Sequence, residues 1–130
     1  MALKLFDKNE KIRESEEKFH KSFEYSPAPM SINDNENNNI FINCNYSFEK
    51  ATGYKKEEIL GKTPADLGFY ADPRDREEIL QILKDTGEVH NYKHNFRDKK
   101  GEISEKFLSI VKVKINNKIH LIVFQNNIDF

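Results

Sequence analysis

The sequence lacks most of what disulfide-bonded, metal-binding and membrane-spanning domains require. Cys44 is the only cysteine among 130 residues, so neither an intrachain disulfide nor a cysteine-based metal site can form. The most apolar stretch, residues 119–124, is far too short to cross a bilayer. The N-terminus carries no apolar signal core. We therefore expect a domain of the reducing cytoplasm that does not itself insert into a membrane, although its parent protein could be membrane-anchored.

Neither positive nor negative charge is in excess. The chain has 21 Lys and Arg against 22 Asp and Glu, for a net charge of −1. A nucleic-acid binder would show a basic face, so we expect no nucleic-acid partner. The sequence contains no paired catalytic carboxylates at recognisable spacing, no nucleophile motif, no phosphate loop and no cluster of metal ligands. We expect a single domain without catalytic activity and without a metal.

The N-terminal segment has the spacing of a helix. Leu5, Ile12 and Phe19 recur every seven residues in a highly charged stretch, which predicts a helix with a narrow apolar stripe. Such a stripe packs either on a partner or on the domain's own sheet. Pro27 and Pro29 end the helix, because proline lacks an N–H group and disfavours helical conformations in the residue before it.

Capping residues bracket the helices in the middle of the chain. Asn45 can cap a short helix that Gly53 ends, and a second short helical turn follows it. Asp72 precedes Pro73, a favoured first helical residue, and Gly87 stands at the far end. These residues predict a longer helix between positions 73 and 86.

Five segments have the composition of strands and are separated by turn residues. They are residues 30–33, 39–44, 89–97, 102–114 and 118–127. Two strands, three short helices and three strands predict an α+β fold: a five-stranded antiparallel sheet with the short helices on one face and an N-terminal flanking helix. Residues 119–124 are almost entirely apolar, which predicts a strand buried on both faces. The N-terminal helix or a second subunit would then cover the outer face.

Several motifs along the chain resemble those of PAS domains. The similarity runs from about Phe19 to Asp129, and the motifs are specific because they occur together in the family's order. They are Ser26-Pro27-Ala28-Pro29-Met30, Asn45-x-x-Phe48, Thr52-Gly53-Tyr54, Glu57-Glu58-Ile59-Leu60-Gly61-Lys62 and Asp72-Pro73-Arg74-Asp75-Arg76. The chain departs from the family at Asp72, where a histidine is usual, and at Asn127-Ile128-Asp129, where Asp-Ile-Thr is usual.

The resemblance implies a sensory or regulatory module of a larger signalling protein, such as a sensor histidine kinase of a two-component system. Residues 1–22 would form an amphipathic flanking helix or linker, and residues 23–130 the PAS sensor domain. Helices and sheet would enclose a cavity for a small ligand, and the domain would form a homodimer or contact other domains of its parent. The alternative is a ligand-free interaction or dimerisation module with a filled core.

Two cofactor types found in the family do not match this sequence. Photoreactive flavin members carry a cysteine shortly after the glycine that matches Gly61, but residues 62–64 contain none and Cys44 lies on the second strand. Haem-binding members use a histidine on or beside the long helix, and no histidine lies between His20 and His90. We expect neither haem nor a photoreactive flavin, and the ligand stays unknown.

Strand parity supplies candidate cavity residues, because side chains two apart share a face. The resemblance places one such set towards the cavity: Ser31, Asn33, Tyr92, His94, Phe96, Lys106, Leu108 and Gln125. A buried lysine is costly without a counter-charge. We therefore hypothesise that Lys106 and His94 bind a small polar or carboxylate metabolite. The alternative is that Lys106 reaches solvent or pairs with a nearby acid.

The alternate side chains of the same strands, on the other face of the sheet, give a candidate dimer interface. On the outer face of the sheet we expect Phe107, Ile122 and Phe124, which would join the N-terminal stripe of Leu5, Ile12 and Phe19. Exposed apolar area of this kind usually marks a contact surface.

Overall fold

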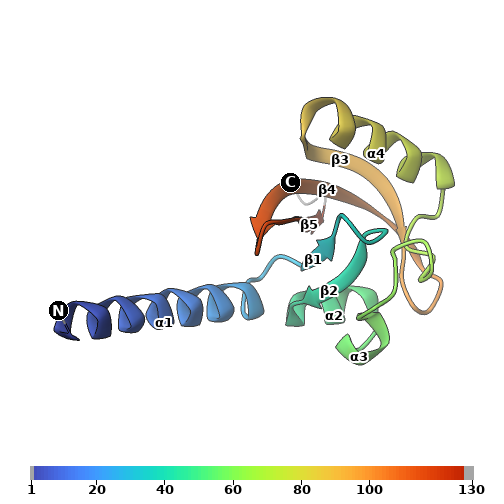
Figure 1. The fold of residues 1–130 in the computed structure, drawn as a ribbon. Coiled ribbons are helices and arrows are strands. Elements are labelled where there is room, and N and C mark those ends of the chain that lie inside the picture. Colours follow the sequence, from blue (N-terminus) through green and yellow to red (C-terminus); the bar gives the residue numbers. More distant parts are fainter. Residues whose placement is uncertain (1, 128–130) are drawn as a thin grey trace.

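The structure is a computed structural model that describes residues 2–127, with the backbone alone for residues 2–7 and 127. One antiparallel sheet with strand order β2-β1-β5-β4-β3 forms its centre (Figure 1). The elements are α1 (Ala2–Glu24), β1 (Met30–Asp34), β2 (Ile40–Cys44), α2 (Tyr46–Thr52), α3 (Lys56–Ile59), α4 (Pro73–Thr86), β3 (Glu88–Arg97), β4 (Ile103–Ile115) and β5 (Lys118–Asn127). This confirms the predicted α+β fold.

The middle helices begin and end at the predicted caps. The side chain of Asn45 accepts a hydrogen bond from a backbone N–H of α2, and Gly53 ends that helix at φ 80°. Asp72 caps α4, Pro73 is its first residue, and Gly87 ends it at φ 86°. Both glycines adopt the left-handed conformation that other residues adopt only with strain.

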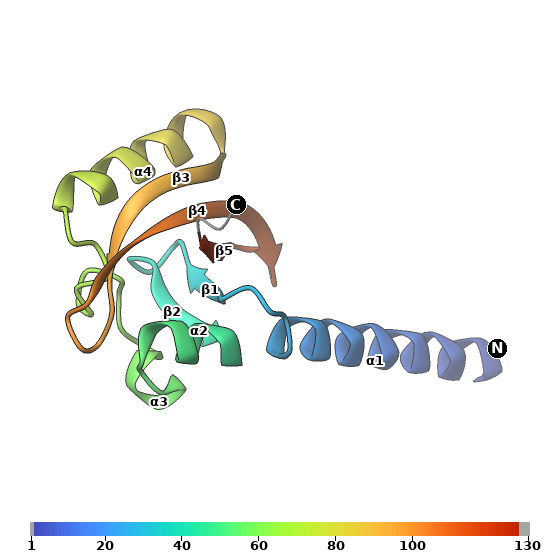
Figure 2. The ribbon, with the colours of Figure 1, turned by 180° about the vertical axis from the view of Figure 1, so that it is seen from behind.

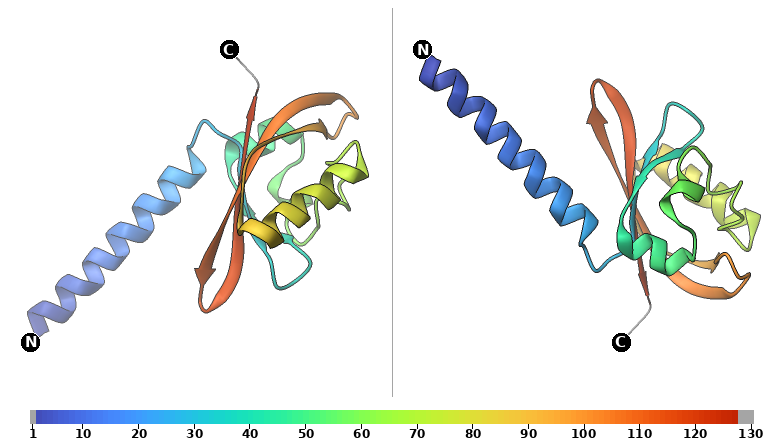
Figure 3. Two further views of the ribbon diagram at one scale, coloured as in Figure 1. Left: turned by 90° about the horizontal axis from the view of Figure 1, so that it is seen from above. Right: turned by 90° about the horizontal axis from the view of Figure 1, so that it is seen from below.

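Helices α2, α3 and α4 lie on one side of the sheet, whereas α1 leads away from the other side (Figures 2 and 3). Ile12 and Phe19 on α1 are 56% and 54% exposed, and among residues 8–24 only Phe23 is buried. Of the two predicted covers for the outer face, α1 is therefore excluded within the described chain.

The prediction that residues 119–124 are buried on both faces is wrong for the chain alone. Leu121, on the inner face, is buried. Ile122 and Phe124, on the outer face, are only partly buried. Helices α2, α3 and α4 all lie on the other side of the sheet.

Two clusters form the core. One gathers around α2 and β2, and its aromatic rings of Phe41, Phe48 and Phe69 contact one another edge-on or tilted. The other lies beneath α4, where Ile79 and Leu83 pack on the inner face of the sheet. Across residues 2–127, we find no helix with the combined length and hydropathy that a membrane span needs.

Candidate ligand pocket

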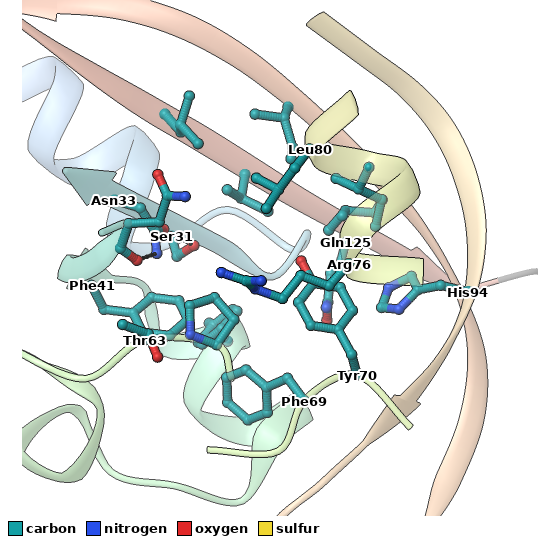
Figure 4. Close-up of a pocket in the computed structure, with 18 of the residues that line it drawn as sticks. Ser31, Asn33, Phe41, Thr63, Phe69, Tyr70, Arg76, Leu80, His94 and Gln125 are labelled. Atoms are coloured by element: carbon teal, nitrogen blue, oxygen red, sulfur yellow. Dashed lines mark hydrogen bonds between the residues drawn. The ribbon is translucent and has the colours of Figure 1, made fainter. Parts of the chain in front are cut away.

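A pocket of about 60 Å³ lies where the two core clusters meet, between the inner face of the sheet and α4 (Figure 4). Its wall contains residues of all five strands, of α2 and α4, of the turn before β2 and of the segment 63–70. A single water needs only roughly 10–15 Å³. The pocket therefore has room for a molecule of a few heavy atoms.

Ser31 and Asn33 on β1 form a polar corner of this wall. The hydroxyl of Ser31 donates to Oδ1 of Asn33 at 2.8 Å, and Nδ2 of Asn33 donates to the backbone oxygen of Asn39 at 2.8 Å. Both side chains are almost fully buried. Because these bonds are internal, they hold the corner in place and tie β1 to the turn that precedes β2.

Three other lining residues carry buried polar atoms without a partner. Both ring nitrogens of His94, Oε1 of Gln125 and Oδ1 of Asn39 make no hydrogen bond with any described residue. His94 is 3% exposed and Gln125 is 5% exposed. Folded proteins leave few buried polar groups unsatisfied. Several such groups in the wall of one cavity therefore indicate a ligand-binding site.

Burial lowers the pKa of His94 below its usual value, and the positive charge of Lys106 acts in the same direction. The carboxylate of Asp75 and the backbone of Asn95 oppose this shift but do not outweigh burial. His94 is therefore neutral near pH 7, with one ring nitrogen as a donor and the other as an acceptor. Its ring lies 5.6 Å from that of Tyr70, whose own pKa burial raises to about 12.

Arg76 supplies the charge of the pocket. It is the one lining residue with a permanent charge, and its guanidinium group extends from α4 into the pocket (Figure 4). Within the described chain it makes no hydrogen bond or salt bridge, whereas its neighbour Arg74 is paired with Asp72 at 3.0 Å. The sequence indicates Arg76 only as part of the motif at the start of the helix. Its spacing of three and four residues from Ile79 and Leu80, which also line the pocket, could have placed it on this face.

The pocket wall brings together five of the eight predicted cavity residues, namely Ser31, Asn33, His94, Leu108 and Gln125. The other three, Tyr92, Phe96 and Lys106, lie outside the wall, contrary to our expectation.

Each of these three has a different environment. The hydroxyl of Tyr92 lies 2.6 Å from Oε2 of Glu78 and 3.1 Å from Oδ1 of Asp75, so it contacts two carboxylates of α4. Phe96 packs into the aromatic cluster, 5.0 Å from the ring of Phe69. Lys106 is half-buried beside His94 in the register of β3 and β4.

The predicted interface residues are only partly covered. Phe107, Ile122 and Phe124 are half-buried on the outer face of the sheet, and Ile103 at the start of β4 is 56% exposed. The side chain of Leu5 lies outside the described residues.

The model of the PAS domain family matches residues 27–129. The chain belongs to the PAS domain family. A comparison with curated proteins found no match. PAS domains are in general non-catalytic sensory modules, and they commonly dimerise or contact other domains.

Solved structures share the fold of this PAS domain. The PAS domain of an HTR-like protein from Haloarcula marismortui is 15% identical with a TM-score of 0.72, covering 94% of this chain and 98% of that one. The PAS domain of the fruit-fly ELK potassium channel is 18% identical with a TM-score of 0.72, covering 88% and 97%. An RNA-binding light-oxygen-voltage receptor is 19% identical with a TM-score of 0.73, covering 85% of this chain but 32% of the receptor. At these identities the similarity establishes the fold alone.

Proposed function

We propose that this PAS domain is a sensory module of a larger signal-transduction protein, such as a sensor histidine kinase, and that it binds a small polar metabolite in its pocket. The observation that carries the proposal is the set of buried polar atoms without a partner on His94, Gln125 and Asn39, all in one wall. In a core that binds no ligand, we would expect these polar atoms to be hydrogen-bonded within the protein or replaced by apolar side chains.

The pocket is suited to control the packing of α4 on the sheet. Arg76, Ile79 and Leu80 bring α4 to one side of the pocket, and strands β1, β4 and β5 form the other. A ligand held between them stabilises the arrangement that it fits best. It shifts the equilibrium only by the difference in its affinity for the two arrangements.

The signal would pass to a second copy of the domain. The apolar stripe of Ile12 and Phe19 on α1 and the outer face at Ile122 and Phe124 are the surfaces we propose for a homodimer or for contact with other domains of the parent. Their partial exposure in the single chain supports this assignment.

We do not propose a photoreactive flavin or a haem. Cys44 is fully buried outside the pocket wall, and burial raises the pKa of its thiol to about 11, so it is neither placed nor ionised for attack on a bound ring. Several similar structures are light-oxygen-voltage domains, which makes flavin the alternative ligand. Visible absorbance of the protein purified from cells grown with riboflavin tests it.

The proposal is tested by thermal shift and calorimetry against a broad panel of small molecules, namely neutral polar, anionic, cationic and aromatic compounds. At least one compound should bind, and Leu80→Trp, which places an indole at the pocket wall, should weaken that binding. Lys84→Trp, one turn further along α4 and exposed, is the matched control. Absence of binding by any compound would favour the ligand-free interaction module instead.

A further inference from the structure

We infer that the ligand is a short carboxylate that also carries a hydrogen-bond donor, as in small hydroxy or amino acids. Arg76 binds the carboxylate, and His94 and Gln125 bind the donor group. This inference rests on the proposed function and names the ligand class of the same pocket.

The charge of the pocket favours a single anionic group. Arg76 is the one permanently charged residue in the wall, and its guanidinium extends into the pocket although the residue as a whole is exposed; it forms no salt bridge or hydrogen bond with a described residue. The planar guanidinium binds a carboxylate through two parallel hydrogen bonds. Asp75, adjacent to Arg76, and Glu78, two residues beyond it, add negative charge nearby, so a dianion such as phosphate is repelled more strongly than a monocarboxylate.

The acceptor atoms without a partner in the pocket wall call for a donor on the ligand. Oε1 of Gln125 and Oδ1 of Asn39 can only accept, and neutral His94 offers one further acceptor and one donor. A carboxylate without other polar groups has no hydrogen to give to these atoms. A hydroxyl or amino group supplies one, and the hydroxyl can also accept from the donor nitrogen of His94.

The rest of the wall limits the size of the ligand. Leu108, Ile110, Leu121 and Val123 make its sheet side apolar, and the volume is about 60 Å³. These walls suit a short aliphatic segment between the carboxylate and the donor, and they offer no second cation for a dicarboxylate.

The experiment compares matched compounds by isothermal titration calorimetry on the whole chain. The probes are short 2-hydroxy and 2-amino acids from glycolate and glycine upward, with lactate as the reference. Lactamide lacks the charge of lactate, propionate lacks its hydroxyl, and inorganic phosphate tests another anion. We expect lactate or a close homologue to bind at least about tenfold more tightly than the amide and the deoxy acid.

Two variants assign the contacts. Arg76→Gln should abolish the preference for lactate over lactamide, whereas Arg74→Gln, two residues earlier, exposed and outside the wall, should retain it. His94→Phe should abolish the preference for lactate over propionate, whereas the exposed His90→Phe should retain it. Thermal melts show that each variant is folded.

The outcomes separate this inference from the proposed function. Binding of neutral compounds or phosphate but of no carboxylate, or unchanged selectivity in folded Arg76→Gln, overturns the inference and leaves the sensory pocket in place. Binding of no compound in either panel overturns both.

Discussion

At the scale of single residues, Asn45 links more segments than its place in the sequence indicates. Its side chain accepts hydrogen bonds from the backbone N–H groups of Phe48 at 2.9 Å and Met30 at 3.0 Å. It donates to the backbone oxygens of Phe23 and Ala28, both at 2.9 Å. One fully buried amide thus connects the end of α1, the loop after it, β1 and the start of α2. Its role as a helix cap was predictable, but its three distant partners were not.

Replacing Asn45 by alanine should therefore cost more than the loss of a helix cap. A cap alone is worth about 1 kcal/mol. Here the substitution also removes three further hydrogen bonds to buried or partly buried backbone groups of Met30, Phe23 and Ala28, so we expect a loss of about 3 kcal/mol in the free energy of unfolding. Urea denaturation measures it. Asp72→Ala, which removes the more exposed cap of α4, is the matched control and should cost about 1 kcal/mol. Equal losses in the two variants would contradict the linking role of Asn45.

His94 should make stability depend on pH. Burial lowers its pKa in the folded state, while in the unfolded chain the value returns to about 6.5. As the pH falls below about 7, the unfolded chain takes up a proton that the folded chain does not, so the free energy of unfolding decreases. The decrease stops below the folded pKa. Asp75 and Lys106, the charged groups that act on this ring, oppose and reinforce the shift respectively.

The measurement is urea denaturation between pH 7.5 and 5. His94→Gln should lose the part of the pH dependence that His94 causes, and the exposed His90→Gln should retain it. Identical pH profiles for the wild type and His94→Gln would show that His94 is not buried in a neutral form.

At the scale of elements, a polar contact between Tyr92 and α4 fixes the helix against β3. The hydroxyl of Tyr92 lies within hydrogen-bond distance of carboxylate oxygens of both Asp75 and Glu78. A hydroxyl has one hydrogen to donate. Desolvation, followed by the two carboxylates, raises the pKa of Tyr92. The contact joins the first turns of α4, from which Arg76 enters the pocket, to a strand of the sheet.

Tyr92→Phe tests this contact with a minimal change in shape. We expect it to reduce the free energy of unfolding by about 1 kcal/mol, because one hydrogen bond to a carboxylate is lost at a partly solvated site. Hydrogen exchange of the amides in α4 should become faster. Tyr25→Phe, at a residue that is 77% exposed, should change neither quantity by more than about 0.5 kcal/mol. Unchanged exchange in α4 would show that apolar packing alone holds the helix.

Local features of the elements could be predicted, whereas contacts between elements could not. The caps at Asp72 and Gly87 act through bonds within a few residues, so the sequence states them directly. Strand parity correctly placed Ser31, His94 and Gln125 on one face. Which residues of that face reach the cavity depends on how α4 sits above it.

Two of the errors in the site arose from this packing. Tyr92 was predicted to line the cavity, but carboxylates on α4 engage its hydroxyl first. Arg76 was not predicted, because its approach to the pocket depends on the position of the whole helix over the sheet.

At the scale of the whole molecule, two apolar surfaces are left uncovered by the described residues. Helix α1 projects from the side of the sheet opposite α4, with Ile12 and Phe19 exposed along it. The outer face of the sheet keeps Ile122 and Phe124 only partly buried. Composition and periodicity could predict that these surfaces are apolar. They could not predict whether α1 folds back or projects, because both arrangements use the same stripe.

If these surfaces join two copies of the chain, a charge on the stripe of α1 should separate them. We expect the double variant Ile12→Glu and Phe19→Glu to shift the molecular mass measured by light scattering from dimer to monomer, or to weaken the dimer by at least about tenfold. Burying two carboxylates against apolar surface is strongly unfavourable. The sheet and its pocket should stay intact, because both side chains are more than half exposed in the single chain.

The control for this prediction also lies on α1. Lys21→Glu changes charge two positions beyond Phe19, about 200° around the helix, where Lys21 is exposed and paired with Glu17 at 3.2 Å. An exposed pair of this kind contributes little, so the dimer should persist in this variant. If both variants remain dimeric, the outer face at Ile122 and Phe124 must carry the contact without α1. If the wild type is monomeric at all concentrations, the stripe serves another domain of the parent protein rather than a second copy. Either result would remove α1 from the route by which a ligand in the pocket reaches a second copy of the domain.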